Sequence, residues 1–157
     1  SNRAWAVGMS DTTHITSGTV TIPQPEGWQD RTVLTIVGPL TEGAQPNVVV
    51  TRETLCNSMG LGGFSSGWVQ KLADQIPVQE SRPVEHIEIS GAPGHLRTVE
   101  WEAAGLRLRQ LVGLTTIGGS GYAIVCTVPS VAFEALEPQL RAVIEGTQID
   151  AGASTES

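Results

Sequence analysis

Residues 63–67 read GFSSG and match the pattern G-x-S-x-G, which surrounds the nucleophilic serine of many hydrolases. Asp74 and His86 follow Ser65 in the order that α/β-hydrolases use for their acid and base. This chemistry requires a strand that leads directly into a helix, because that sharp turn exposes the serine hydroxyl. Here the preceding strand is predicted to end near Arg52, well before the motif. We interpret the motif as the start of a helix and keep a Ser65 hydrolase as a remote alternative.

Two other patterns suggest a cofactor or a metal ion, but each is incomplete. The glycine-rich loop at residues 60–65 has serine where a dinucleotide-binding loop has its third glycine, and no βαβ unit surrounds it. His86 and Glu88 lie two residues apart on a predicted strand and would supply two ligands, whereas zinc needs three or four. His95 has no evident partner. We expect Glu88 to pair with Arg97 across the sheet, and we expect no cofactor and no metal site.

The overall composition limits the classes of function. The chain has 157 residues, of which 39% are hydrophobic and 16% charged, as is typical of one soluble globular domain. Its formal net charge of −7 and its single lysine, Lys71, argue against nucleic acid as a partner, because phosphates attract clustered basic residues. No stretch approaches the roughly 18 apolar residues that a membrane span needs. Cys56 and Cys126 are too few for a disulfide framework, so we predict two free thiols.

The predicted organisation is one domain over residues 16–149, with a tag or disordered extension at residues 1–15 and a polar tail at residues 150–157. Met9 is a candidate native start, and the residues after it lack the basic and apolar regions of a secretory signal. This pattern favours a cytoplasmic location, or an extracytoplasmic one if an export signal precedes residue 1.

The elements that must position these residues are predicted from hydrophobic periodicity and turn residues. Strands are expected at residues 19–22, 32–37 and 48–50, and the valines of the third strand indicate that both of its faces are covered. The corner at residues 27–31, which contains Trp28, is interpreted as a plug at one end of the sheet rather than as a reactive site. A helix is expected next, with four apolar side chains on one side: Phe64, Trp68, Leu72 and Ile76.

The second half of the chain predicts a meander of four strands and a closing helix. Loops at residues 91–94, 103–105 and 118–121 separate the strands, and their glycines permit the positive φ that tight turns need. Ser130 is expected to cap the last helix, which Pro138 would kink or split. The apolar stripe of this helix comprises Phe133, Leu136, Leu140, Val143 and Ile144.

The loop positions also predict which side chains share a face of the sheet. They place Ser90 opposite His95 and Glu102 opposite Leu106, since paired residues count outward from each turn. One face then becomes apolar core, and the other mixes charged and apolar side chains. The mixed face needs a cover, because the predicted helices are too few to hide both faces.

The mixed face is the candidate partner-binding site. Aromatic residues and arginines beside apolar ones are enriched at protein interfaces, so we predict that a protein binds there. Trp101 is placed opposite Arg107, where the two would stack as a cation–π pair. We assign apolar contacts to three residues, and hydrogen bonds to partner carbonyls or carboxylates to two arginines: Val99, Trp101, Leu111, Arg107 and Arg109.

The order of these segments resembles that of the DcrB-like family, within the PsbP-like fold. The resemblance rests on GTVTIPQPEGWQDRTVLTIV, NVVVTRETL and WVQKLADQI in the first half. It continues in ISGAPGHLRTVEWEAAGLRLRQLVGL and VAFEALEPQLRAVIEGTQI, and it covers Thr19 to Ile149. It implies an α+β fold, with a twisted antiparallel sheet of about six strands and helices packed on it.

The resemblance further implies a protein without enzymatic activity. In layout the chain is most similar to the Eag-type chaperones of type VI secretion, which form homodimers and shelter apolar transmembrane helices of effectors before export. We therefore expect a cytoplasmic chaperone or adaptor, whose partners are an apolar helix of a secreted effector and a second copy of the chain. The alternative is an envelope-associated, lipoprotein-type binding module of the same fold.

Overall fold

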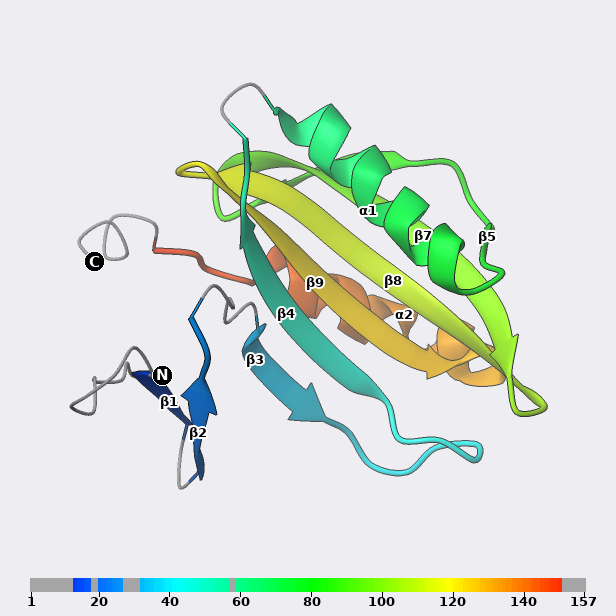
Figure 1. Ribbon diagram of the computed structural model, residues 1–157. Coiled ribbons are helices and arrows are strands. Elements are labelled where there is room, and N and C mark those ends of the chain that lie inside the picture. The colour runs from blue at the N-terminus through cyan, green and yellow to red at the C-terminus, as the bar shows by residue number, and fades with distance from the viewer. Residues whose placement is uncertain (1–12, 18–19, 27–31, 57–58, 151–157) are drawn as a thin grey trace.

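The computed structural model describes residues 13–17, 20–26, 32–56 and 59–150. Its elements, labelled in Figure 1, follow in this order: β1 (Thr13–Ser17), β2 (Val20–Gln24), β3 (Thr32–Val37), β4 (Asn47–Thr54), α1 (Leu61–Gln75), β5 (Gln79–Glu80), β6 (Glu85–Ile89), β7 (Ala92–Ala103), β8 (Leu106–Ile117), β9 (Ser120–Pro129) and α2 (Ser130–Glu145).

Seven of the strands form one twisted sheet with a helix on each face. The strand order is β3-β4-β9-β8-β7-β5, and β6 pairs with β7 alongside β5. The described pairings are all antiparallel. α1 lies on one face and α2 on the other (Figure 1). The predicted α+β fold is thus confirmed, with seven strands in the main sheet instead of about six.

β1 and β2 form a separate antiparallel hairpin. The sequence predicted a strand at residues 19–22 that stops at Pro23, but β2 runs on through this proline to Gln24. β1 was not predicted, and it begins within the extension proposed for residues 1–15. The corner at residues 27–31 lies outside the described residues, so the role predicted for Trp28 stays a prediction.

Two-residue turns connect the strands of the meander. Ser90 and Gly91 have φ values of 54° and 81°, and Ala104 and Gly105 have φ values of 53° and 79°. Positive φ at both central residues is the mark of a type I′ hairpin, whose twist matches that of the flanking strands. The loops predicted at residues 91–94 and 103–105 are therefore shorter than expected.

The shorter turns change the predicted register. His86 lies opposite His95, and Ala103 lies opposite Leu106. In the hairpin of β7 and β8 the change is one residue. Because side chains alternate between the faces of a strand, this shift moves every β8 side chain to the face opposite the predicted one.

α2 packs on β6, β8 and β9. It is one helix with Pro138 inside, so the predicted split does not occur. The proline removes one backbone hydrogen bond, but it lies on the exposed side while the apolar stripe binds the sheet on both sides of it. The approach is close: a Cβ at Gly113 of β8 would lie 2.5 Å from Ile144 Cγ2. The predicted stripe is confirmed, with its most buried members Phe133, Leu140 and Ile144.

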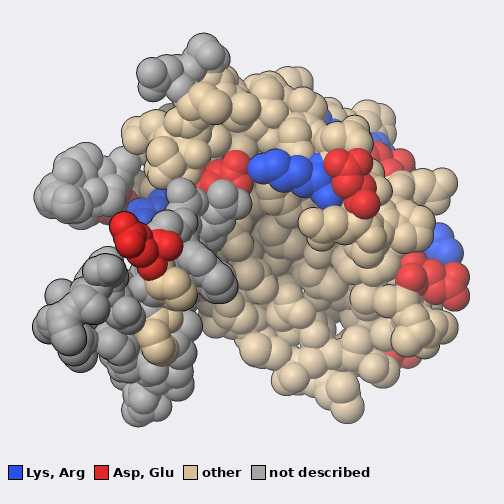
Figure 2. All heavy atoms as spheres, in the orientation of Figure 1, with Lys and Arg blue, Asp and Glu red and all other residues tan. Residues whose placement is uncertain are grey.

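α1 packs mainly on β7 and β8 of the other face. Phe64 is buried above β9, where a Cβ at Gly121 would lie 2.5 Å from its ring. The helix does not extend over β3 and reaches β4 only near Glu53, which pairs with Lys71 (Figure 1). Figure 2 shows an area over β9 and β4 with few charged side chains. The valines of β4 were predicted to be covered on both faces of the strand. Val48 and Val50 are buried on the α2 side, whereas Val49 on the α1 side is only half-buried.

Candidate functional site

The five residues predicted to bind a partner do not share a face. Val99 and Trp101 point to the α1 side, whereas Arg109 and Leu111 point to the α2 side, because Trp101 pairs with Leu108 and not with Arg107. The predicted common face is therefore wrong because the turn at residues 104–105 has two residues, and a role of the single residues in partner binding stays a prediction. The stack of Trp101 on Arg107 is excluded for the same reason.

Several of these side chains are used within the chain itself. Val99 and Leu111 have no exposed surface. The guanidinium of Arg109 lies 4.8 Å from the ring centre of Phe133 on α2 and 3.1 Å from the Glu100 carboxylate. Arg107, more than half exposed, approaches the same carboxylate at 3.5 Å. Two buried apolar residues and two paired arginines give little free surface for a partner.

Glu100 collects hydrogen bonds at the start of α2. The Ser130 hydroxyl donates to its Oε2 at 2.7 Å and is the main cause that lowers the Glu100 pKa, followed by Arg109. Ser130 was predicted to cap α2, but Pro129 is the N-cap residue and no side chain caps the helix. The serine instead joins α2 to β7.

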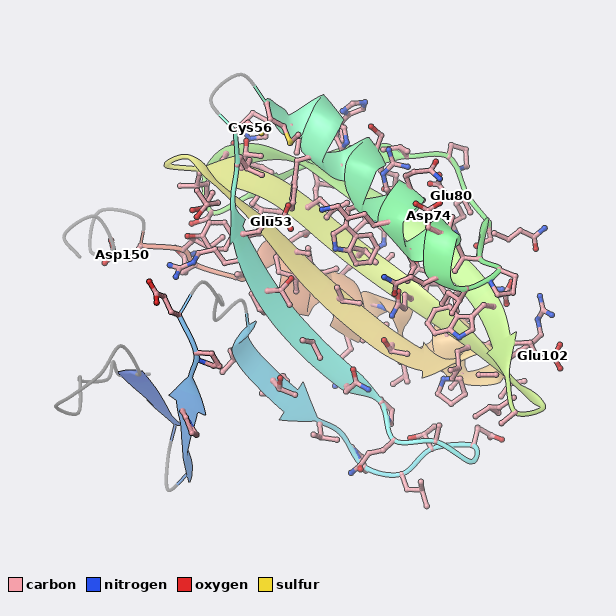
Figure 3. The ribbon with its side chains drawn as sticks, viewed as in Figure 1. Glu53, Cys56, Asp74, Glu80, Glu102 and Asp150 are labelled. Atoms are coloured by element: carbon pink, nitrogen blue, oxygen red, sulfur yellow. The ribbon has the colours of Figure 1, made fainter. Side chains whose placement is uncertain are left out.

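The GFSSG motif lies within α1 and not at a strand-to-helix turn. Ser65 is fully buried, and His95 Nδ1 and Arg97 Nε each lie 2.8 Å from its Oγ. Arg97 also pairs with Glu80, at 2.8 Å. Asp74 is exposed on α1 and accepts a hydrogen bond from Gln70, and His95 rather than His86 contacts Ser65, so the triad that the remote hydrolase alternative requires does not assemble. Figure 3 shows Asp74 near the C-terminal end of the helix and Glu80 on β5.

This Ser65 cluster holds α1 on the sheet. Burial first, and then His86 and Arg97, lower the pKa of His95. Arg97 Nε donates to the Ser65 oxygen, and the hydroxyl shares a second hydrogen bond with His95 Nδ1. An acyl-transfer site would need the serine oxygen open to a substrate, and this oxygen is enclosed. Ser65 and His95 are in contact as a nucleophile and its base would be, but the buried serine serves to hold α1 against the sheet.

The structure bears on three further predictions: the pair of Glu88 with Arg97, the metal ligands and the two cysteines. Glu88 lies opposite Pro93, so the predicted pair with Arg97 is wrong. Within the described ranges no three histidine, cysteine or acidic side chains gather as metal ligands. Cys56 and Cys126 are both free, as predicted; Cys126 is buried, which raises its pKa to about 12.

An exposed apolar strip follows β3, the strand at the edge of the sheet. Four large apolar side chains of the described chain, 49% to 76% exposed, define this β3 strip: Leu34, Ile36, Val37 and Leu40. Glu42 is the first charged residue after Thr32. Leu34 and Ile36 lie on the α2 side of the strand, and Val37 alternates to the other side. Exposed apolar side chains that gather along one edge of a soluble protein mark an interaction site. The sequence reasoning missed this strip, although the uncharged run TVLTIVGPL carries its signal.

A groove separates the strip from α2. This β3–α2 groove has a volume of about 260 Å³ and is bounded by Ile36 and Val37 on β3 and by Leu136, Leu140 and Val143 on α2. The remaining lining residues come from the chain between β3 and β4, from the start of β4 and from Gln139, and none of the lining residues carries a charge. The groove therefore suits an uncharged, apolar occupant.

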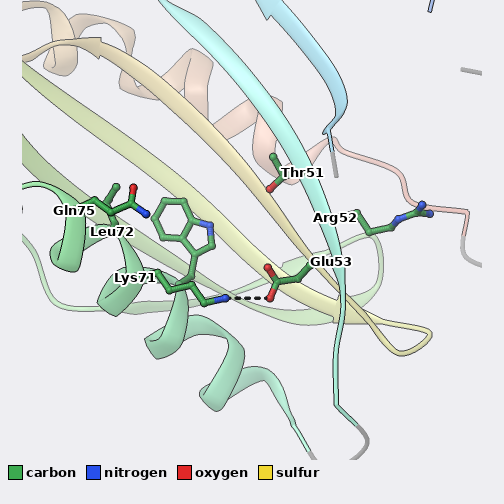
Figure 4. Close-up of a pocket in the computed structure, with 7 residues that line it drawn as sticks. Thr51, Arg52, Glu53, Lys71, Leu72 and Gln75 are labelled. Atoms are coloured by element: carbon green, nitrogen blue, oxygen red, sulfur yellow. Dashed lines mark ion pairs between the residues drawn. The ribbon is translucent and has the colours of Figure 1, made fainter. Parts of the chain in front are cut away.

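A second hollow lies between β4 and α1. It has a volume of about 270 Å³, and Trp68 lines it together with Thr51 and Leu72 (Figure 4). Lys71 and Glu53 face each other across it at 3.7 Å. Because charged and polar side chains line much of this hollow and its lysine is exposed to solvent, it is a weaker candidate for an apolar partner than the β3–α2 groove.

The fold places the chain in the class of PsbP-like α+β domains. The solution structure of the cyanobacterial PsbP protein CyanoP from Synechocystis sp. PCC 6803 has a TM-score of 0.51 and 10% identity, over 90% of this chain and 94% of that one. A protein of unknown function from Pseudomonas aeruginosa, PA94, has a TM-score of 0.68 and 14% identity, over 90% of this chain and 99% of that one. Identities this low speak to the fold alone.

The family of the chain follows from its sequence rather than from the likeness in fold. Residues 18–146 match the family model DcrB, so the chain belongs to the DcrB family. A comparison with curated proteins gave no match. The finer resemblance to Eag-type chaperones of type VI secretion is not supported by these matches and stays a prediction. In the described part of the chain, no helix has both the length and the apolar character to cross a membrane.

Proposed function

We propose that this DcrB family member is a non-catalytic binding protein, which shelters an apolar segment of a partner polypeptide in the β3–α2 groove. The observation that carries the proposal is the exposed β3 strip beside a groove without charge. The expected partner is an apolar helix of a secreted effector, and the protein would act as its chaperone or adaptor. The residues that carry binding are then on β3 and α2, in place of the set predicted on the meander.

The energetics favour an apolar helix over a charged ligand. Ile36 is 49% exposed, and covering it fully would contribute about 1 kcal/mol, with similar terms from Val37 and Leu136. A charged ligand would lose water on entry and meet no opposite charge in the lining. Several such apolar contacts together are needed to offset the cost of association.

The test uses an uncharged synthetic helix of leucine and alanine, about 20 residues long, which aggregates alone. Purified protein should keep this peptide in the supernatant after centrifugation. Ile36→Asp places a charge in the groove and should abolish the effect. Val131→Asp, at an apolar residue 78% exposed outside the groove, should leave it intact. Equal behaviour of both variants, or no effect of the wild-type protein, would contradict the proposal.

A further inference from the structure

The two edges of the main sheet are built in opposite ways. At one edge, β7 is flanked by the short strands β5 and β6, which carry Glu80, Glu85 and Glu88. Short and charged edge strands prevent pairing with another chain. At the other edge, β3 has six residues, TVLTIV, with no charge and no proline. Among the described strands, β4 is its single partner.

The hydrogen-bond pattern shows which backbone groups of β3 are left open. The Gly38 N–H donates to the Pro46 carbonyl at 2.7 Å, one position beyond the pair Val37–Asn47. Bonded pairs alternate along an antiparallel ladder, so Ile36 also bonds to β4, whereas Thr35 and Val37 direct their N–H and C=O groups away from it. An extended strand can satisfy such groups, but a helix cannot, since its own backbone groups are already bonded.

We propose that a second copy of this chain occupies the edge, with β3 paired antiparallel to β3 of the copy and Ile36 opposite Ile36. Pairing across a two-fold axis must set a residue opposite itself, because opposite side chains share a face of the sheet. Centred on Ile36, each Thr35 faces a Val37 of the copy, and all four open N–H groups find carbonyl acceptors. This register also avoids the irregularity between Thr32 and Leu34.

Side chains and charge both favour the copy as the occupant. The pairing brings the half-exposed Ile36 side chains together, with each Leu34 beside them on the same face. Although each copy carries a net charge of −7, residues 32–41 contain no charged side chain, so like charges are not forced together. Six strand residues bury less area than a standard interface, which predicts a dimer that dissociates on dilution.

This pairing gives a surface to the second copy of the chain that the resemblance led us to expect, and it rests on the β3 edge and not on the proposed function. Sedimentation equilibrium should show a monomer and dimer whose ratio depends on concentration. Thr35→Pro removes an open N–H without touching the β4 ladder and should weaken the dimer about tenfold or more. If that variant misfolds, Val37→Lys tests the same edge. Val131→Lys is the control and should dimerise normally. A wild-type chain that is monomeric at all concentrations overturns the proposal, even if another segment of the same chain then covers the β3 edge.

Cysteine crosslinking tests the register in a Cys56→Ser background. Ile36→Cys alone should form a disulfide dimer, since opposite Cα atoms in such a pair are about 4.5 Å apart. Thr35→Cys alone and Val37→Cys alone should not, because like residues then lie about 8 Å apart. A mixture of the two single variants should crosslink. Crosslinking of Thr35→Cys alone, or none by Ile36→Cys, overturns the register.

The peptide assay separates this inference from the proposed function. Thr35→Pro keeps the groove residues, so the monomeric variant should still hold the apolar peptide in solution. A wild-type monomer that holds the peptide overturns the β3 pairing alone. A dimer with the predicted crosslinks that fails to hold the peptide overturns the proposed function alone.

Discussion

Glycine decides how closely each helix approaches the sheet. A Cβ at Gly121 would lie 2.5 to 2.7 Å from three ring atoms of Phe64, and Phe64 is itself buried. We predict that Gly121→Ala lowers the free energy of unfolding by about 1–3 kcal/mol, because the ring must move out of its site. Urea denaturation measures the change.

The control for this substitution lies in α1. Gly67 is inside the helix, and a Cβ there would meet nothing within 4 Å. Gly67→Ala should therefore raise the free energy of unfolding by about 0.5–1 kcal/mol through helix propensity. A Gly121→Ala variant as stable as the wild type would show that α1 packs more loosely than described.

His95 makes stability depend on pH. Burial, His86 and Arg97 lower its pKa below the ordinary value of 6.5 in the folded state. As pH falls below 6.5, His95 is therefore protonated in the unfolded chain before it is protonated in the folded one. The unfolded state is then favoured, and stability should fall as pH drops from 6.5 toward the lowered folded pKa. His95→Gln should flatten the dependence over this window in urea denaturation. An unchanged slope in His95→Gln would assign the dependence to other groups.

At the scale of elements, an ion-pair network joins α2 to β6. Glu137 accepts from Arg82 at 2.6 Å and from Arg141 at 3.0 Å, while Arg141 reaches Glu85 at 2.7 Å. The hydrogen bond from Arg82, with the one from Arg141, lowers the Glu137 pKa from 4.5 to about 2. Glu85 is held below its ordinary pKa mainly by Arg141.

The network predicts a stability term that is lost in acid. Because the Glu137 pKa is lowered, its contribution is complete above pH 4.5 and disappears as pH falls toward about 2. Glu137→Gln should cost about 1–2 kcal/mol at neutral pH, given partial exposure of both arginines. Glu134→Gln, exposed on the same helix, serves as the control. A difference between Glu137→Gln and wild type that persists unchanged at pH 2 would contradict this assignment.

The helices could be predicted from the sequence because their signal is local. Phe64, Trp68 and Leu72 recur at helical spacing, and the stripe of α2 survives Pro138. The β7–β8 register could not be predicted in the same way. It depends on whether Ala104 adopts a left-handed conformation, and alanine does so only when the twist of the paired strands requires it.

At the scale of the whole molecule, the candidate site depends on strand order. Residues 32–37 were predicted as a strand, but their exposure follows from their position at the edge, which contacts between distant segments decide. The same limit explains Ser65 and His95. They lie thirty residues apart in the chain and meet because α1 folds over β7. Local patterns name such residues but do not say which of them will be exposed.

The β3 strip and the β3–α2 groove together form the proposed binding surface, and methyl-detected NMR during titration with the apolar peptide tests it most directly. We predict that shifts concentrate on four residues that line the groove: Ile36, Val37, Leu136 and Val143. Methyl groups packed under α1, such as those of Val112 and Leu114, should stay unchanged. Shifts centred on residues under α1, or the absence of any shift at saturating peptide, would contradict it.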